Sequence, residues 1–142
     1  MVNQDVLMEK AGNIRRCLKR IKDTTNLNPD TLRDIDKQDI FVLNLQRAVQ
    51  STIDLAAHVV ADESLGWAEN LRDNFQLLYQ ANIIPDALNK SMQSMVGFRN
   101  IAVHEYQSLK LEILQKILTD YIDDLELFYQ TILKYYEKKA DQ

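Results

Sequence analysis

The sequence is poor in the residues that break or cross-link a chain. Its 142 residues include three glycines, two prolines and a single cysteine, Cys17. Scarce glycine and proline disfavour β-sandwiches and barrels, which need many tight turns. A lone cysteine can form neither an internal disulfide nor a Cys-x-x-Cys zinc site. The sequence also lacks both common glycine-rich loops that bind phosphate. A chain of this length predicts one domain.

Long hydrophobic runs and a positive net charge are also missing. No apolar run reaches the roughly 18 residues that a membrane span requires, so no membrane association is expected. The N-terminal residues lack the pattern of a signal peptide, and a lone cysteine fits the cytoplasm. The net charge is −4. Because proteins that coat nucleic acid by charge alone are normally basic, this balance disfavours broad binding but is compatible with a local basic site.

Apolar residues recur with a helical period along most of the chain, and no segment alternates as a strand does. The second predicted helix has the broadest apolar face, which is typical of a central helix. Ser108 is the expected N-cap of the last helix. The predicted fold is an all-α antiparallel bundle of four long helices and one short helix. The predicted helices span about 3–23, 36–60, 69–81 (the short one), 85–104 and 108–138.

Two polar residues stand out near the end of the fourth predicted helix. Arg99 shares an otherwise apolar stripe with Met92, Met95 and Ala102. Burying an unpaired guanidinium is costly, so Arg99 is expected to pair with a carboxylate or to face an interface or a site. His104 follows five residues later, where the negative end of a helix favours the protonated imidazole.

An arginine that grips a phosphate beside a histidine that moves a proton is the minimum set for phosphodiester cleavage. In RNA the 2′-hydroxyl is the nucleophile, so neither a metal nor a protein nucleophile is required. Such a reaction benefits from both a base and an acid, whereas the chain offers one histidine here. A two-fold dimer with the fourth helix at its axis would supply two. The alternative is a structural arginine–carboxylate pair and a helix-terminal histidine without a catalytic role.

The spelling Arg99-x4-His104-x-Tyr106, with Asn100 directly after the arginine, resembles the signature of HEPN-domain ribonucleases. It is most similar to the HepT-type toxins that are paired with a minimal nucleotidyltransferase antitoxin of the MntA type. The likeness covers essentially the whole chain, and two further segments resemble the family, 44–50 and 95–100.

This resemblance implies a single HEPN-type helical domain over residues 1–142, acting as the toxin of a type VII-like toxin–antitoxin pair. It implies a homodimer through the fourth helix that cleaves RNA without a metal or other cofactor. Arg99 would hold phosphate, His104 would move protons and Asn100 would assist. The partner nucleotidyltransferase would silence the toxin by moving AMP onto Tyr106, where the added phosphates would repel RNA.

The other histidine, His58, lies between Asp54 and Asp62 at helical spacing in the second predicted helix. A metal would need a third or fourth ligand, and no second histidine is near in sequence. The favoured interpretation is a hydrogen-bonded ladder without a metal. A position of Asp54 or His58 at the catalytic cleft stays open.

A basic run without any acid occupies the first predicted helix. Arg15, Arg16 and Lys19 are candidates for contact with RNA or with the antitoxin, followed by Arg20 and Lys22. The favoured alternative is a solvated face whose cations suit the C-terminal end of the helix.

Two other functions are compatible with the residues. One is a non-catalytic helical subunit that binds a nucleotidyltransferase and presents substrate to it. The other is a purely structural helical dimer. Both differ from the ribonuclease hypothesis in that Arg99 and His104 would not be needed for loss of RNA.

Overall fold

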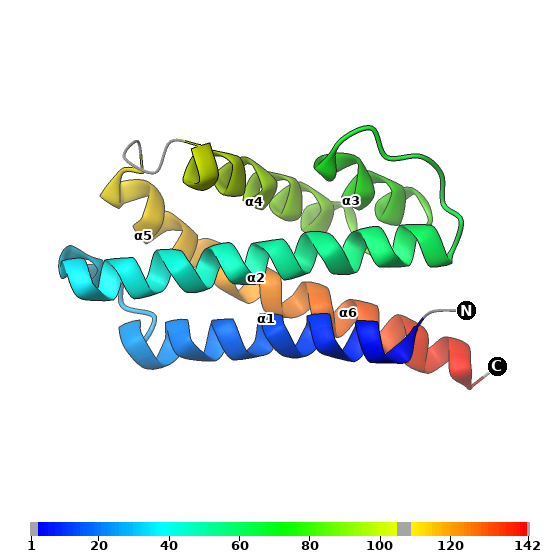
Figure 1. The fold of residues 1–142 in the computed structure, drawn as a ribbon, viewed down its shortest axis with the longest axis horizontal. Coiled ribbons are helices and arrows are strands. Elements are labelled where there is room, and N and C mark those ends of the chain that lie inside the picture. Colours follow the sequence, from blue (N-terminus) through cyan, green and yellow to red (C-terminus); the bar gives the residue numbers. More distant parts are fainter. Residues whose placement is uncertain (1–2, 105–108, 142) are drawn as a thin grey trace.

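The computed structural model describes residues 3–104 and 109–141, with the backbone alone at 103 and 104. Within these residues it contains no strand, and Figure 1 shows the long helices α1, α2, α4 and α6 running alternately in opposite directions. The all-α antiparallel bundle predicted from the sequence is confirmed. The elements are α1 (Gln4–Thr25), the 3-10 helix η1 (Pro29–Arg33), α2 (Ile35–Asp62), α3 (Leu71–Gln80), α4 (Asp86–His104), α5 (Leu111–Asp120) and α6 (Ile122–Ala140).

Polar side chains set the ends of the first two long helices. The Asn3 side chain accepts from the backbone N–H groups that begin α1, and Asn26 ends this helix in the left-handed conformation with φ 51°. Asp34 caps the start of α2 in the same way as Asn3 caps α1. The connection between them also contains η1, a short helix that lies between the predicted helices 3–23 and 36–60 and was not expected. The first four predicted helices, 3–23, 36–60, 69–81 and 85–104, begin and end within about two residues of the observed ones.

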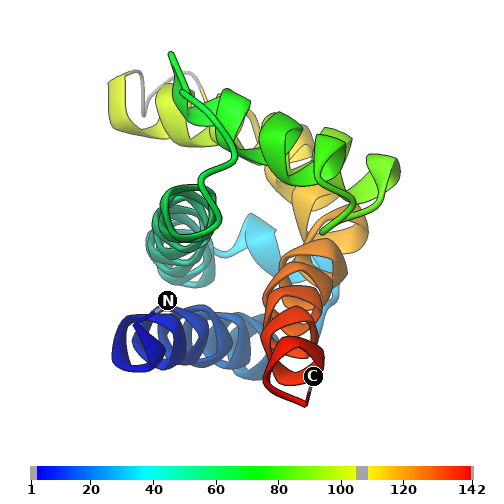
Figure 2. The ribbon, with the colours of Figure 1, turned by 90° about the vertical axis from the view of Figure 1, so that its right-hand side faces the viewer.

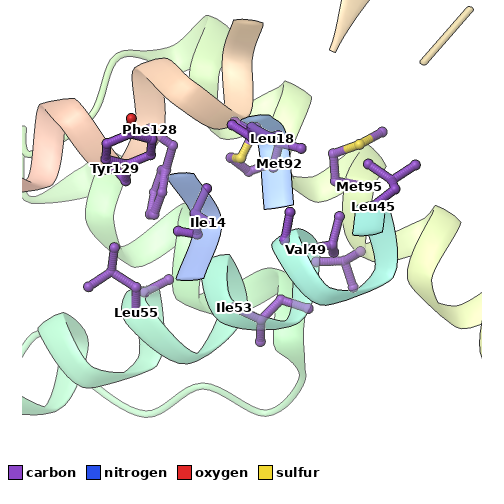
Figure 3. Packing of buried hydrophobic residues seen from close by; sticks show 14 of the residues in the cluster. Ile14, Leu18, Leu45, Val49, Ile53, Leu55, Met92, Met95, Phe128 and Tyr129 are labelled. Atoms are coloured by element: carbon purple, nitrogen blue, oxygen red, sulfur yellow. The ribbon is translucent and has the colours of Figure 1, made fainter. Parts of the chain in front are cut away.

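α2 is the central helix, as its broad apolar face predicts. Figure 2 shows it between α1 on one side and the α3–α4 pair on the other, while α6 runs beside α1. The core lies where these helices meet, and Figure 3 shows part of it. Its fully buried side chains include Ile14 and Leu18 from α1, Leu45 and Leu55 from α2, Met92 from α4 and Phe128 from α6.

The expectation of one helix over 108–138 is wrong, because the chain divides at Tyr121. This residue has φ −115° and ψ −16°, and it separates α5 from α6. The two halves have different partners: α5 packs on η1, where the Gln115 side chain donates to the Pro29 carbonyl at 3.0 Å, and α6 packs on α1 and α2. Ser108, the expected N-cap, lies outside the described residues, and α5 begins after Lys110 without a side-chain cap.

None of the helices among the described residues is both long and apolar enough to cross a membrane.

Candidate active site

The site is built on the C-terminal half of α4, whose buried face holds this helix against the bundle. Met92, Met95 and Ala102 are all at most 3% exposed. Arg99 lies at the edge of that face and is half-buried, while Asn100 is exposed. The packing of the apolar residues therefore fixes where the Arg99 side chain leaves the helix, which is towards α2.

Two side-chain amides hold the Arg99 guanidinium. Its Nε donates to Gln50 Oε1 at 3.3 Å, and its Nη1 donates to Asn100 Oδ1 at 3.2 Å. Among the described residues, no carboxylate lies within 4.0 Å of this guanidinium. The carboxylate pair expected as one alternative for Arg99 is therefore not found among the described residues. An amide orients the cation without neutralising it.

Gln50 is itself held by Asp54, one turn further along α2. Gln50 Nε2 donates to Asp54 Oδ1 at 2.9 Å, and Lys10 Nζ of α1 lies 3.3 Å from Asp54 Oδ2. Because the amide nitrogen faces the carboxylate, the amide oxygen must face Arg99. The structure thus connects Asp54 to Arg99 through Gln50, a residue to which the sequence reasoning assigned no role. The i, i+4 spacing of Gln50 and Asp54 was the available signal.

The flanking carboxylates of His58 have other partners. Asp54 binds Gln50 and Lys10, and Asp62 accepts a hydrogen bond from the Tyr136 hydroxyl at 3.0 Å. His58 Nε2 is buried and has no hydrogen-bond partner among the described residues. Within residues 3–102 and 109–141, whose side chains are described, no group of three or more His, Cys, Asp or Glu residues could hold a metal ion.

The basic run of α1 is partly paired and lies away from Arg99. Arg15, Arg16 and Lys19 are exposed, and Lys19 pairs with Asp23 at 3.0 Å. Lys22 reaches Glu126 of α6 at 2.9 Å. Figure 2 shows α2 standing between α1 and α4. The structure therefore does not bring this run to the α4 site.

The rest of the motif is only partly within the described residues. His104 is the last residue of α4, as expected from the sequence, but its side chain is not described. Tyr106 lies outside the described residues altogether.

Two hollows flank the end of α4. One, of about 560 Å³, is lined by Asn100 and Val96 of α4 and by residues at the start of α3. The other, of about 360 Å³, is mostly apolar and lies between α4 and α5. Its lining includes Phe98, Ile101 and Ile113, of which the two isoleucines are 41% and 42% exposed.

The helical bundle and the arginine-centred site at the end of α4 define the class as a HEPN-type helical protein. The family model described as "Ribonuclease HepT-like" matches residues 14–132. The chain belongs to the HepT-like ribonuclease family.

Known relatives share most of the chain. The mRNA nuclease HepT of Shewanella oneidensis is 38% identical over 128 residues, which are 90% of this chain and 96% of that protein. Two solved structures each align with a TM-score of 0.84 and 37% identity over 92% of this chain and 98% of theirs. One is a toxin–antitoxin complex with AMP-PNP. The other is a tri-AMPylated Shewanella oneidensis HEPN toxin in complex with its MNT antitoxin.

Proposed function

We propose that this chain is a metal-independent endoribonuclease and the toxin of a type VII-like toxin–antitoxin pair, with residues 1–142 forming one domain. The family membership and the mRNA nuclease among its relatives support this activity. The single observation that carries the proposal is the Arg99–Gln50 contact at 3.3 Å, because it holds a cation that no described carboxylate neutralises. Such a group is ready to bind a phosphate.

The reaction uses the 2′-hydroxyl of RNA as the nucleophile. A histidine base takes the proton from this hydroxyl, the 2′-oxygen bonds to phosphorus, and the bond from phosphorus to the 5′-oxygen breaks. An acid then protonates the departing 5′-oxygen, which leaves a 2′,3′-cyclic phosphate and a 5′-hydroxyl. Arg99 stabilises the charge that builds on the phosphate oxygens, and Asn100 keeps its Nη1 in place.

A homodimer through α4 supplies the second proton-transfer group. Each protomer contributes one His104, so a two-fold axis beside the ends of the two helices gives one base and one acid. The apolar hollow between α4 and α5 supports this arrangement, because Ile101 and Ile113 leave apolar surface exposed there. In the dimer this surface is covered by the partner.

A nucleotidyltransferase antitoxin regulates the toxin by transferring AMP to Tyr106. The phenol loses its proton to solvent and its oxygen bonds to the α-phosphorus of ATP. The bond from the α-phosphorus to the oxygen that bridges to the β-phosphate breaks, and pyrophosphate leaves with the electron pair. The AMPylated relative in complex with its antitoxin supports this step. The proposed reactions need RNA as substrate and ATP as the source of AMP. Because both are present in the cytoplasm, the protein acts there.

The test is cleavage of a defined single-stranded RNA by the purified chain in the presence of EDTA. Wild type is expected to cleave and to leave 2′,3′-cyclic phosphate ends, whereas Arg99→Ala and His104→Ala should lose at least about a hundredfold in rate. Equal cleavage by His104→Ala and wild type would refute the mechanism. Absence of cleavage by wild type, combined with binding to the antitoxin, would favour the alternative of a non-catalytic subunit that presents substrate.

A further inference from the structure

Arg72 lies in the first turn of α3 and reaches across to the backbone of α4. Its Nε donates to the carbonyl of Gln93 at 3.2 Å. Its Nη2 is 2.8 Å from the point that a Cβ atom would occupy at Gly97. Real Cβ atoms essentially never approach a neighbour this closely, so the guanidinium occupies its present position because residue 97 is a glycine.

This contact brings Arg72 close to the α4 motif. Gly97 and Asn100 are three residues apart, which places them on one side of the helix and about 4.5 Å apart along its axis. Arg72 and Asn100 also line the same hollow of about 560 Å³ between the start of α3 and α4. The volume lies within the usual range of ligand pockets. Asn100 in turn contacts Arg99, so the two arginines flank one asparagine.

The charge of Arg72 is not compensated within the described part of the chain. No carboxylate there forms an ion pair with it, although Glu69 lines the same hollow. The bond to the Gln93 carbonyl occupies Nε alone and holds the planar group in place. Nη1 and Nη2 form no hydrogen bond with the described residues, and such a pair of donors can bind a phosphate.

We propose that Arg72 is an RNA-binding residue that contacts the phosphate of a nucleotide next to the scissile bond, held in the hollow between α3 and α4. This inference rests on the proposed ribonuclease function and extends its site from α4 to α3. In a chain of net charge −4, RNA must be held by a few well-placed cations. Arg99 holds the reacting phosphate and Arg72 the neighbouring one. Gly97 is the residue that makes room for this second contact.

The first test is steady-state cleavage of a short single-stranded RNA by Arg72→Ala. Since the contacted phosphate takes no part in the bond changes, the contact stabilises the bound substrate and the transition state equally. We expect KM to rise about tenfold with kcat nearly unchanged. The slope of log KM against log salt should fall by about 0.7, the value for one phosphate of a single strand. Arg72→Lys should recover part of the loss because it retains the charge.

The second test uses Gly97→Ala, which is expected to displace the guanidinium without removing it. This substitution should raise KM when Arg72 is present. In the Arg72→Ala background the same change should have no effect on KM, because the added methyl group then meets no side chain. A KM increase of equal size in both backgrounds would show that Gly97 acts through something other than Arg72, and it would overturn the proposed role of Gly97.

The matched control is Lys134→Ala. Lys134 is an exposed cation of α6 and lines neither of the two hollows that Arg72 lines. Its loss should leave KM within about twofold of wild type. If the control variant raises KM as much as Arg72→Ala does, the effect comes from the loss of any positive charge and not from a specific contact. That result would overturn the inference.

Binding of the same RNA to the His104→Ala protein, measured by fluorescence anisotropy, separates this inference from the proposed function. If adding Arg72→Ala leaves the Kd for RNA unchanged, the inference fails even where wild type cleaves RNA. If Arg72→Ala weakens binding of the antitoxin and not of RNA, Arg72 belongs to a protein interface and the inference also fails. If wild type binds RNA through Arg72 without cleaving it, the proposed function fails and the inference stands.

Discussion

Gln50 accepts a hydrogen bond from Arg99 Nε at 3.3 Å and donates one to Asp54 at 2.9 Å, so a neutral amide stands between a cation and a carboxylate. This arrangement orients Arg99 and keeps the negative charge one side chain away from it. A carboxylate in direct contact would compete with the phosphate of RNA for the guanidinium. Lys10 balances the charge of Asp54 on its far side.

Loss of the Gln50 amide should therefore impair catalysis more than folding. Gln50→Ala is expected to lower kcat/KM about tenfold, because Arg99 loses the contact that orients it. The free energy of unfolding should change by less than about 1 kcal/mol, since the hydrogen bonds are at the edge of the core. RNA cleavage and urea unfolding of the same preparation measure the two effects.

Gln46→Ala is the control for this prediction. Gln46 is half-buried one turn earlier on α2, and its side chain forms no hydrogen bond with the described residues. It should cleave RNA like wild type. A Gln50→Ala protein with unchanged kcat/KM would show that Arg99 needs no such support.

The fold follows from the sequence wherever apolar spacing changes at a helix end. α1 to α4 were predicted to within about two residues because polar caps and turn-forming residues interrupt the apolar period between them. The break at Tyr121 could not be predicted, because the apolar period continues from Leu118 to Leu125 without a glycine or proline. At this break α5 packs on η1 whereas α6 packs on α1 and α2, and such contacts between distant parts of the chain leave no local sequence pattern.

The residues of the α4 site could be predicted from the sequence only where they have a local pattern. Arg99 stands out in sequence because it interrupts an apolar stripe, and Asn100 is its neighbour. Gln50 and Arg72 reach the site from other helices, and a glutamine or an exposed arginine has no distinctive local pattern. Gly97 carried a signal, as a glycine inside a helix costs about 1 kcal/mol relative to alanine and so calls for a reason. In the structure, Arg72 Nη2 lies 2.8 Å from the position that a Cβ atom would occupy at this glycine.

A charge placed in the apolar hollow between α4 and α5 is expected to disrupt the dimer. Ile101→Glu places a charge in surface that the partner would cover, so the protein should become monomeric at micromolar concentration. The isolated monomer should retain its helical circular dichroism and lose at least about a hundredfold in RNA cleavage, since each cleft would then hold one His104. Sedimentation velocity measures the oligomeric state.

The control for the dimer prediction is Leu127→Glu. Leu127 is 48% exposed on α6 and does not line this hollow. It should leave both oligomeric state and activity unchanged. An Ile101→Glu protein that remains dimeric, or that cleaves RNA as a monomer, would contradict the dimer requirement.

Ionisation of Tyr136 is expected to destabilise the protein at alkaline pH. Burial raises the pKa of its phenol above the ordinary value of 10.0, and the hydrogen bond to Asp62 and the charge of that carboxylate raise it further. The folded protein therefore holds the phenol proton more tightly than the unfolded chain does. As the pH rises past about 10, the unfolded chain ionises first and the free energy of unfolding falls.

Tyr136→Phe should reduce this alkaline loss while costing about 1 kcal/mol at pH 7 through the missing hydrogen bond. Urea unfolding of both proteins between pH 7 and pH 11 measures the difference, in which the ionisation of lysines and Cys17 largely cancels. Tyr135→Phe is the comparison, because burial also raises the pKa of Tyr135 but this side chain is less buried. Parallel curves for wild type and Tyr136→Phe would show that the Tyr136 proton is not linked to folding.

AMP transfer to Tyr106 should block RNA binding rather than the chemical step alone. Each phosphodiester adds one negative charge close to the motif in sequence, where it competes with RNA for Arg99. Incubation with the partner nucleotidyltransferase and ATP should raise the intact mass by whole AMP units and raise the Kd for RNA at least about tenfold. Tyr106→Phe should keep its mass and its RNA affinity under the same treatment.

An AMP adduct that persists in Tyr106→Phe would assign the acceptor to another side chain. An adduct on Tyr106 that leaves RNA affinity unchanged would place the block at the reacting atoms instead.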